Sequence, residues 1–280
     1  MKGKVCVITG ANRGIGKATA TVLSQLGATV ILACRDIERG EIVKADIISA
    51  TNNPNVELML VDLSLQESIQ KMVTAFGKIH DRLDVLVNNA AVYKSKREMT
   101  PAGLEMMFAT NHLGPFLLTN LLLDKLKASP PGRVLVVTAP STTPIDFENL
   151  QGEKRFNSLQ AFGVTKMCNL LFTYELSRRL AGTGVTVNAV HPGLTKTSLM
   201  IEAPVILRWL TQVVSKTPEK AAKSLAYLAS SAEIANISGR FFKDGKEIKS
   251  NQYSHDQNVQ RQLWEVSTAL IKPQLGSVSQ

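Results

Sequence analysis

The sequence lacks the features that mark several large classes of protein. No stretch reaches the roughly 18 consecutive apolar residues that a membrane-spanning helix requires, and the most apolar segment, 113–123, is interrupted by Gly114 and Pro115. Basic residues outnumber acidic ones, 32 to 23, but they are scattered and not interleaved with aromatic residues. We therefore expect no transmembrane segment and no nucleic-acid partner. The net charge of +9 suits an anionic cofactor and a solvated surface.

Cysteine is scarce and has no metal-binding pattern. The three cysteines, Cys6, Cys34 and Cys168, are widely spaced and odd in number. Two of them lie in apolar, strand-like segments, where cysteine behaves as a small hydrophobic residue. No charged leader with an apolar segment and a cleavage site stands before the first strand-like run at Val5. We expect a cytoplasmic protein without a bound metal.

The stretch KVCVITGANRGIGK, residues 4–17, carries the first functional signal. The apolar run Val5 to Thr9 predicts a strand buried on both faces, and a glycine-rich turn then leads into an apolar helix pattern. Glycine allows backbone N–H groups to approach a pyrophosphate at the start of a helix. A glycine triplet alone also occurs in loops without a ligand, but its place between strand and helix favours a dinucleotide site. The residues expected to form it are Gly10, Asn12, Arg13, Gly14, Ile15 and Gly16.

The end of the second predicted strand, 28–34, bears on the choice of cofactor. An NAD enzyme usually has an acid there for the ribose 2′-hydroxyl, whereas the 2′-phosphate of NADP needs a cation. Here Arg35 follows the strand, and Arg13 lies in the glycine turn. Two guanidinium groups reaching one pocket favour NADP(H) over NAD(H). The alternative is two ordinary surface arginines, and Asp36 next to Arg35 weighs against NADP(H).

Polar residues also follow the next two predicted strands. Asp62 and Leu63 close one of them, and Asp62 either accepts a hydrogen bond from the adenine amino group or caps a turn. Asn89 and Ala90 follow the other, where an amide side chain can hold the loop that covers the cofactor. These four residues extend the predicted cofactor site.

Strands and helices alternate along the whole chain, which predicts an α/β fold. We expect a Rossmann-type, doubly wound and mostly parallel sheet of seven strands with helices on both faces. A chain of 280 residues, 44% of them hydrophobic, can bury one large core, so a single domain is expected over 1–280. The apolar segment 203–216 is expected to form a lid over a lipophilic substrate, with peripheral membrane contact by 203–214 as the alternative. The polar tail 273–280 is expected to be disordered.

These motifs resemble the short-chain dehydrogenase/reductase family over nearly the whole chain. The matching segments are Thr9-Gly10-x3-Gly14-Ile15-Gly16, Asp62-Leu63, Asn88-Asn89-Ala90, Asn111-His112-Leu113-Gly114 and His191-Pro192-Gly193. Three further segments resemble the retinol dehydrogenase branch: Ala33-Cys34-Arg35-Asp36, Leu150-Gln151-Gly152-Glu153-Lys154 and Leu263-Trp264-Glu265-Val266-Ser267. The resemblance implies an NADP-dependent oxidoreductase for a lipophilic alcohol or carbonyl. It also implies a homodimer or homotetramer that associates through the apolar helices 104–123 and 158–180. The apolar stripe of the first of these is otherwise explained as core.

The resemblance assigns roles to individual residues. Asn111 would interrupt its helix and hold a water in a proton relay. Lys166 would grip the nicotinamide ribose and lower the pKa of a catalytic tyrosine one helical turn before it. The residues implied for the nicotinamide carboxamide are Pro192 and Gly193 with Thr195 or Thr197.

The catalytic set implied by the family is incomplete in this chain. Phe162 stands where the tyrosine of a Tyr-x-x-x-Lys pair is expected before Lys166, and Ala139 stands where the catalytic serine is expected. No Tyr-x-x-x-Lys occurs anywhere in the sequence. Because a general acid contributes about 10²–10⁴ in rate, we expect ordinary redox turnover to be weak or lost. Two substitutes stay open: Ser141, or the threonine after it, for the serine, and Tyr93 for the phenol.

Three classes of function follow from this sequence. The first is an NADP-dependent oxidoreductase with a substitute proton donor. The second is a non-redox catalyst, such as a cyclase or isomerase, that uses the pocket for its shape. The third is a catalytically inactive NADP(H)-binding sensor or partner module.

Overall fold

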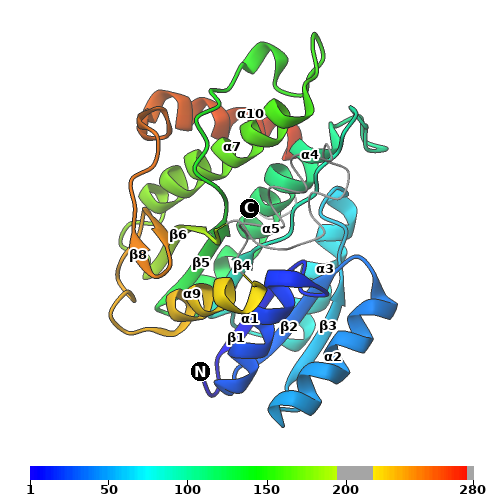
Figure 1. Cartoon of the computed structure of the whole chain (residues 1–280), viewed down its shortest axis with the longest axis vertical. Helices are drawn as coiled ribbons and strands as arrows, with labels where there is room; N and C mark the ends of the chain where they lie inside the picture. The colour runs from blue at the N-terminus through cyan, green and yellow to red at the C-terminus, as the bar shows by residue number, and fades with distance from the viewer. Residues whose placement is uncertain (194–216, 276–280) are drawn as a thin grey trace.

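The computed structural model describes residues 1–193 and 217–275, and its strands form one sheet (Figure 1). The strand order is β3-β2-β1-β4-β5-β6-β7-β8. β1 to β7 pair in parallel, and the predicted doubly wound α/β fold is confirmed. The strand bounds are Val5–Thr9 (β1), Thr29–Cys34 (β2), Val56–Leu60 (β3), Val85–Asn88 (β4), Gly132–Val137 (β5), Val185–His191 (β6), Arg240–Lys243 (β7) and Lys246–Glu247 (β8).

β8 is one strand more than the seven expected from sequence, and it pairs antiparallel with β7. The two strands are joined by Asp244 and Gly245, whose φ angles are 53° and 77°. Two consecutive residues with positive φ are what a tight type I′ hairpin turn requires. Because β8 has only two residues, it leaves no hydrophobic alternation from which a strand can be predicted.

Helices cover both faces of the sheet (Figure 1). Neighbouring helices α2, α1 and α9 cover one face, and α3, α5 and α7 cover the other. The helix α10 lies outside this second layer, against α7 and α5. The bounds are Gly14–Gln25 (α1), Ile37–Thr51 (α2), Gln66–Ile79 (α3), Met106–Phe108 (α4), Gly114–Leu121 (α5), Leu123–Lys127 (α6), Ser158–Arg179 (α7), Pro218–Ser230 (α9) and Gln257–Leu275 (α10). A π-helical turn, Ala109–Leu113, joins α4 to α5, and two 3₁₀ turns span Phe147–Asn149 and Gln252–His255.

The layers explain why the central strands read as uninterrupted apolar runs. In β1, Val7 and Ile8 have no exposed surface and belong to the cores on opposite faces of the sheet. Parallel strands that helices cover on both faces have no solvent-exposed side, so their sequences do not alternate between apolar and polar residues. The polar residues at the strand ends therefore lie at the edges of the sheet, where a site can form.

Several expectations concern segments at the limit of the described structure. The predicted lid 203–216 and the possible membrane contact 203–214 lie outside the described residues. The first three residues of the tail predicted to be disordered, 273–275, belong to α10, which runs to Leu275, and 276–280 lie outside the described residues. None of the described helices is long and apolar enough to cross a membrane.

Candidate functional site

The glycine turn connects β1 to α1 at the carboxyl end of the strand. Gly10 and Gly14 have φ angles of 66° and 52°, a left-handed conformation that glycine adopts at no steric cost. At Gly16 a Cβ atom would lie 2.3 Å from the carbonyl oxygen of Gly10 and 2.8 Å from Nδ2 of Asn89. The first two glycines allow the turn, and the third allows α1 to start in contact with it.

Thr9 ties this turn to the end of β4. Its Oγ1 accepts hydrogen bonds from the backbone N–H groups of Asn89 and Ala90, at 2.9 and 3.0 Å. The side chain of Asn89 donates from Nδ2 to the Thr9 carbonyl at 2.8 Å. The sequence analysis did not place Thr9 in the site, although a buried hydroxyl at the end of an apolar strand is the signal that could have identified it.

A cleft of about 510 Å³ runs along this edge of the sheet. It is lined by every predicted cofactor residue up to Ala90 except Gly16, together with Val92, Thr110 and Pro218. Within the described chain, its lining does not extend to Lys166, Pro192 or Gly193. Thr195 and Thr197, predicted for the carboxamide, lie outside the described residues.

Three arginines meet at one end of the cleft. They come from the glycine turn (Arg13), the end of β2 (Arg35) and the first turn of α2 (Arg39). Burial, and then the charges of Arg39 and Arg35, lower the pKa of Arg13. Arg39 also donates from Nε to the backbone oxygen of Asn12 at 3.2 Å, so it reaches across the glycine turn. Arg39 was missed in the sequence because only the fold brings α2 next to this turn.

The two acidic residues at this end of the cleft, Asp36 and Asp62, form hydrogen bonds with other groups of the protein. Asp36 is the N-cap of α2, where its Oδ1 accepts a hydrogen bond from the backbone N–H of Arg39 at 3.0 Å. Asp62 accepts hydrogen bonds from the backbone and the hydroxyl of Ser64 at 2.9 and 2.6 Å. Its other oxygen lies 3.8 Å from Nη1 of Arg35. The carboxylate of Asp36, next to Arg35 in the sequence, thus caps the first turn of α2.

Phe162 and Lys166 lie one turn apart on α7. The Lys166 Nζ atom is 4.9 Å from the centroid of the Phe162 ring, a cation–π arrangement. Lys166 is only 7% exposed, and burial lowers its pKa to about 8. In the described parts of the chain, no carboxylate forms an ion pair with this ammonium group. The lysine therefore faces an aromatic ring at the position where the sequence resemblance leads us to expect a phenol.

Ala139 and Ser141 follow β5. Ala139 has no hydroxyl group, and the Oγ of Ser141 donates to the carbonyl of Gly163 at 2.8 Å. The same Oγ accepts a hydrogen bond from the backbone N–H of Thr143 at 3.2 Å. Through these hydrogen bonds Ser141 connects the loop after β5 to the first turns of α7.

Tyr93 lies beside Phe162 but its hydroxyl points elsewhere. The two rings meet edge to face with centroids 5.7 Å apart, and Tyr93 is 3% exposed. Its hydroxyl donates to Oγ of Ser158 at 2.9 Å. Ser158 lies one helical turn before Phe162, and Lys166 lies one turn after it. Phe162 therefore separates the Tyr93 hydroxyl from the ammonium group.

Asn111 lies in the π-helical turn, so it does interrupt the regular helix. Its Oδ1 accepts from the backbone N–H of Val92 at 2.8 Å, and its Nδ2 donates to the Val92 carbonyl at 2.9 Å. Nδ2 also lies 3.3 Å from Oγ1 of Thr165, the neighbour of Lys166. Asn111 thus joins one wall of the cleft to α7.

The cleft lies where the strand order reverses, because β1 pairs with β2 on one side and with β4 on the other. At such a point the loops that follow adjacent strands separate and leave a crevice at the carboxyl ends of the strands. A glycine turn and a helix N-terminus open into this crevice. Fold and site together define a dinucleotide-binding protein.

Comparison with known proteins specifies the family. A family model described as short chain dehydrogenase matches residues 4–204, and the chain belongs to this family. Retinol dehydrogenase 13 from Mus musculus is 41% identical over 280 residues, which cover 96% of this chain and 84% of that protein.

Two solved structures are also similar. An uncharacterized protein from Mycobacterium Paratuberculosis has a TM-score of 0.79 at 31% identity, with 97% of this chain and 94% of that chain covered. A metagenomic short-chain oxidoreductase in complex with NADP has a TM-score of 0.66 at 27% identity, with 86% and 96% covered.

Proposed function

We propose that this protein binds NADP(H) in preference to NAD(H) and that its redox turnover on a lipophilic alcohol or carbonyl is weak or lost. The observation that carries the proposal is the phenyl ring of Phe162 beside the ammonium group of Lys166. A phenyl ring fills the volume of a phenol but has no proton to donate or accept. On this proposal the site retains cofactor binding while its capacity for proton transfer is weak or lost.

The cleft residues fit a nicotinamide dinucleotide. The cradle at Gly10 and Gly16 would be filled by any Cβ atom, which leaves the backbone open to a pyrophosphate. When bound, NADPH would supply the hydride for reduction of a carbonyl. Within this chain, the glycine turn would hold the pyrophosphate, and Asn111 would keep Val92 in the cleft wall.

The preference for NADP(H) is supported by the charge at one end of the cleft. A 2′-phosphate carries about two negative charges, which favour the guanidinium groups of Arg13, Arg35 and Arg39. Asp36, which could have accepted from a ribose 2′-hydroxyl, caps α2. The metagenomic neighbour in complex with NADP agrees with this proposal.

The substrate class is proposed from the relatives. Retinol dehydrogenase 13 is named for a lipophilic alcohol, and the chain covers most of that protein. We propose a lipophilic small molecule as the ligand next to the nicotinamide, contained in part by the segment 203–216.

A second candidate is an NADP(H)-binding module without redox chemistry. It is favoured by the hydroxyl groups of Ser141 and Tyr93, the two possible substitutes, which bond to Gly163 and Ser158. On this proposal the site keeps cofactor affinity and has no proton donor.

One experiment separates the two candidates. NADPH and NADH are titrated against the wild-type protein, and NADPH oxidation is then followed with a panel of aldehydes and ketones of increasing chain length. Tight NADPH binding with turnover of some carbonyl supports the oxidoreductase, and binding without turnover supports the module. Failure to bind either dinucleotide would overturn both.

Assembly and location remain predictions. A homodimer or homotetramer through helices 104–123 and 158–180 would have to use surface that α10 leaves open, because α10 covers part of both helices. A monomeric sedimentation profile at micromolar concentration would count against it. We propose a cytoplasmic location, with which the three free, buried cysteines agree.

A further inference from the structure

The outer helix α10 is attached to the helices beneath it by one large side chain. Trp264 packs against Phe116 of α5 and Phe172 of α7, with ring centroids 4.8 and 6.2 Å away. The guanidinium of Arg179 lies over the same indole, 4.2 Å from its centroid. Stacked and cation–π contacts of this kind add to the area that the indole buries, so α10 is a firmly packed element.

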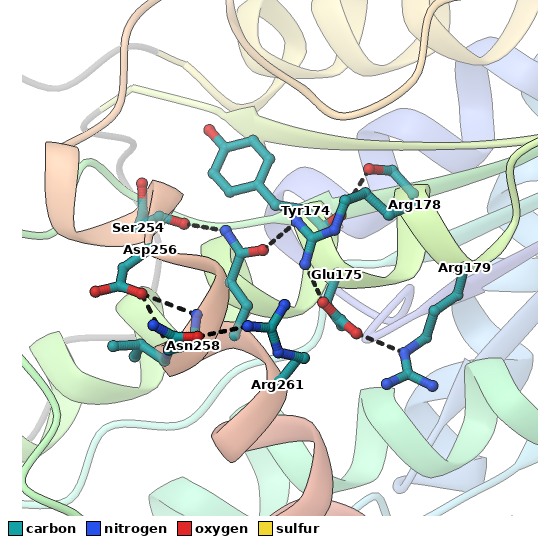
Figure 2. Close-up of polar contacts among 11 residues, drawn as sticks. Tyr174, Glu175, Arg178, Arg179, Ser254, Asp256, Asn258 and Arg261 are labelled. Atoms are coloured by element: carbon teal, nitrogen blue, oxygen red, sulfur yellow. Dashed lines mark hydrogen bonds and ion pairs between the residues drawn. The ribbon is translucent and has the colours of Figure 1, made fainter.

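Polar contacts reinforce the start of α10 (Figure 2). Glu175, which is buried on α7, accepts hydrogen bonds from Arg178 and from Nε of Arg179, the latter at 2.7 Å. Arg178 also donates to the side chain of Gln260, and Gln260 donates from Nε2 to the Ser254 carbonyl at 2.6 Å. The first turn of α10 is thereby held to α7 through Gln260 and Arg178, and to the preceding 3₁₀ turn through Gln260 and Ser254.

One turn after Trp264 on α10, Ser267 makes a contact of a different kind. Its hydroxyl is fully buried and lies 2.9 Å from Nε2 of His112. His112 is 1% exposed and lies among the rings of Phe108, Phe116 and Phe172. Burial lowers its pKa to about 4, so the ring is neutral at physiological pH. Ser267 is thus a polar partner brought from a remote part of the sequence into an aromatic core.

His112 belongs to the same π-helical turn as Asn111. Consecutive residues of a helical turn point in different directions, so Asn111 reaches Val92 and Thr165 while His112 reaches α10. A π-helical turn is a rare, local departure from the regular helix, and contacts on its two sides can hold its register. The turn therefore lies between the cleft wall and α10.

We propose that Ser267 is a positioning residue of the cofactor cleft. By bonding to His112, it holds the π-helical turn in the register that places the Asn111 amide against Val92. α10 thereby shapes one wall of the cleft from the outside of the molecule. This role explains Ser267 of the motif Leu263-Trp264-Glu265-Val266-Ser267, which lies three positions after Trp264 on the same helix face.

Amide hydrogen exchange on the cofactor-free protein tests the proposal. Ser267→Ala removes the hydroxyl, and we expect exchange in 90–93 and 109–116 to become at least about tenfold faster, which corresponds to roughly 1.4 kcal/mol of lost local protection. The matched control is Thr268→Ala on the same helix, because the Thr268 hydroxyl donates to the Trp264 carbonyl of its own helix. This control should leave both segments unchanged.

A second comparison separates positioning from general support. Trp264→Leu loosens α10 without removing the His112 partner, so it should lower the thermal midpoint and affect the α7–α10 interface broadly. Ser267→Ala should instead act selectively on 90–93 and 109–116, and it should weaken NADPH binding about three- to tenfold.

Equal exchange in Ser267→Ala and Thr268→Ala, or a Ser267→Ala pattern indistinguishable from that of Trp264→Leu, would overturn the proposal. Because exchange is measured without cofactor, a wild-type protein that fails to bind NADP(H) would overturn the proposed function and still leave this test decisive.

Discussion

The ammonium group of Lys166 lies 4.9 Å from the centre of the Phe162 ring, and burial brings the pKa of this lysine down to about 8. Both side chains project from one face of α7, one helical turn apart. A hydroxyl group at the para position of that ring would lie in the same site, close enough to be influenced by the ammonium charge. The proposed loss of proton transfer can therefore be tested by adding one oxygen atom to this ring.

Restoring that hydroxyl should restore activity. Phe162→Tyr, alone or with Ala139→Ser, is expected to raise NADPH-dependent reduction of some lipophilic carbonyl by at least about tenfold, within the range that one general acid supplies. The ring already fits its volume, so the added oxygen should cost little stability. The measurement is NADPH oxidation by wild type and variant with the same carbonyl panel.

The control for this gain is the double variant Phe162→Tyr with Lys166→Met, which has the phenol but no ammonium group beside it. It should lose most of the increase. A wild-type rate equal to that of Phe162→Tyr, and typical of working enzymes, would show that another residue donates the proton.

The arginine cluster should decide between the two dinucleotides. We expect NADPH to bind at least about tenfold more tightly than NADH, a difference of roughly 1.4 kcal/mol. Arg39→Ala should reduce this preference because it removes one of three guanidinium groups, while NADH affinity changes little. Fluorescence titration of both cofactors measures the effect.

Lys44→Ala provides the matched control, since Lys44 lies on the same helix and pairs with Glu41 outside the cleft. It should leave both affinities unchanged. Equal affinity of the wild-type protein for NADPH and NADH would contradict the assignment of the cluster.

The glycine at position 16 should tolerate no side chain. In Gly16→Ala the new Cβ atom would lie 2.3 Å from the carbonyl oxygen of Gly10, so the turn must move. We expect NADPH binding to be lost and the free energy of unfolding to fall by about 1–3 kcal/mol, as for other overpacked sites. Isothermal titration and urea unfolding measure the two effects.

Gly77→Ala is the control for this change. Gly77 lies inside α3, where an added Cβ would meet only Cε of Lys125 at 4.0 Å. Alanine has the higher helix propensity, so this variant should bind NADPH normally and be more stable by up to about 1 kcal/mol. Similar destabilisation of both variants would argue against a specific steric role for Gly16.

The buried histidine should make stability depend on pH. His112 has a pKa of about 4 in the folded chain, below its ordinary value of 6.5, because burial disfavours the charged ring. Between pH 6.5 and 4 the unfolded chain binds a proton that the folded chain does not, so the free energy of unfolding falls as pH falls. The loss attributable to His112 across this window is on the order of 3 kcal/mol.

Urea unfolding at several pH values between 4 and 7 measures this dependence. His112→Gln should flatten the slope in this window, whatever its stability at pH 7. His255→Gln, which changes an exposed histidine, should keep the wild-type slope. A slope unchanged in His112→Gln would mean that other groups cause the acid sensitivity.

Much of the fold could be predicted because its signals are local. The apolar run Val5 to Thr9 and the glycines after it are contiguous in the chain, and they mark β1 and the start of α1. The spacing of Phe162 and Lys166 needs only the helical repeat to place both on one face. For the same reason the absence of a Tyr-x-x-x-Lys pair could be recognised without a structure.

Other features of the site depend on contacts between distant segments. Arg39 reaches the backbone of Asn12, and Thr9 bonds to Asn89 and Ala90. The Asp36 carboxylate could be read from sequence as an argument against NADP, but the structure places it at the start of α2. Only the packing of strands and helices determines which of these groups meet.

The apolar helices 104–123 and 158–180 show which features can be predicted from the sequence and which require the tertiary structure. The sequence alone indicated that 104–123 carries an apolar stripe, since the helical period of its apolar residues shows that one face avoids water. It could not determine what covers that stripe, because a core, a partner subunit and another helix of the same chain all bury apolar surface equally well. The tertiary structure decided that Trp264 of α10 covers Phe116 and Phe172, since such packing depends on shape and position in space rather than on spacing along the chain.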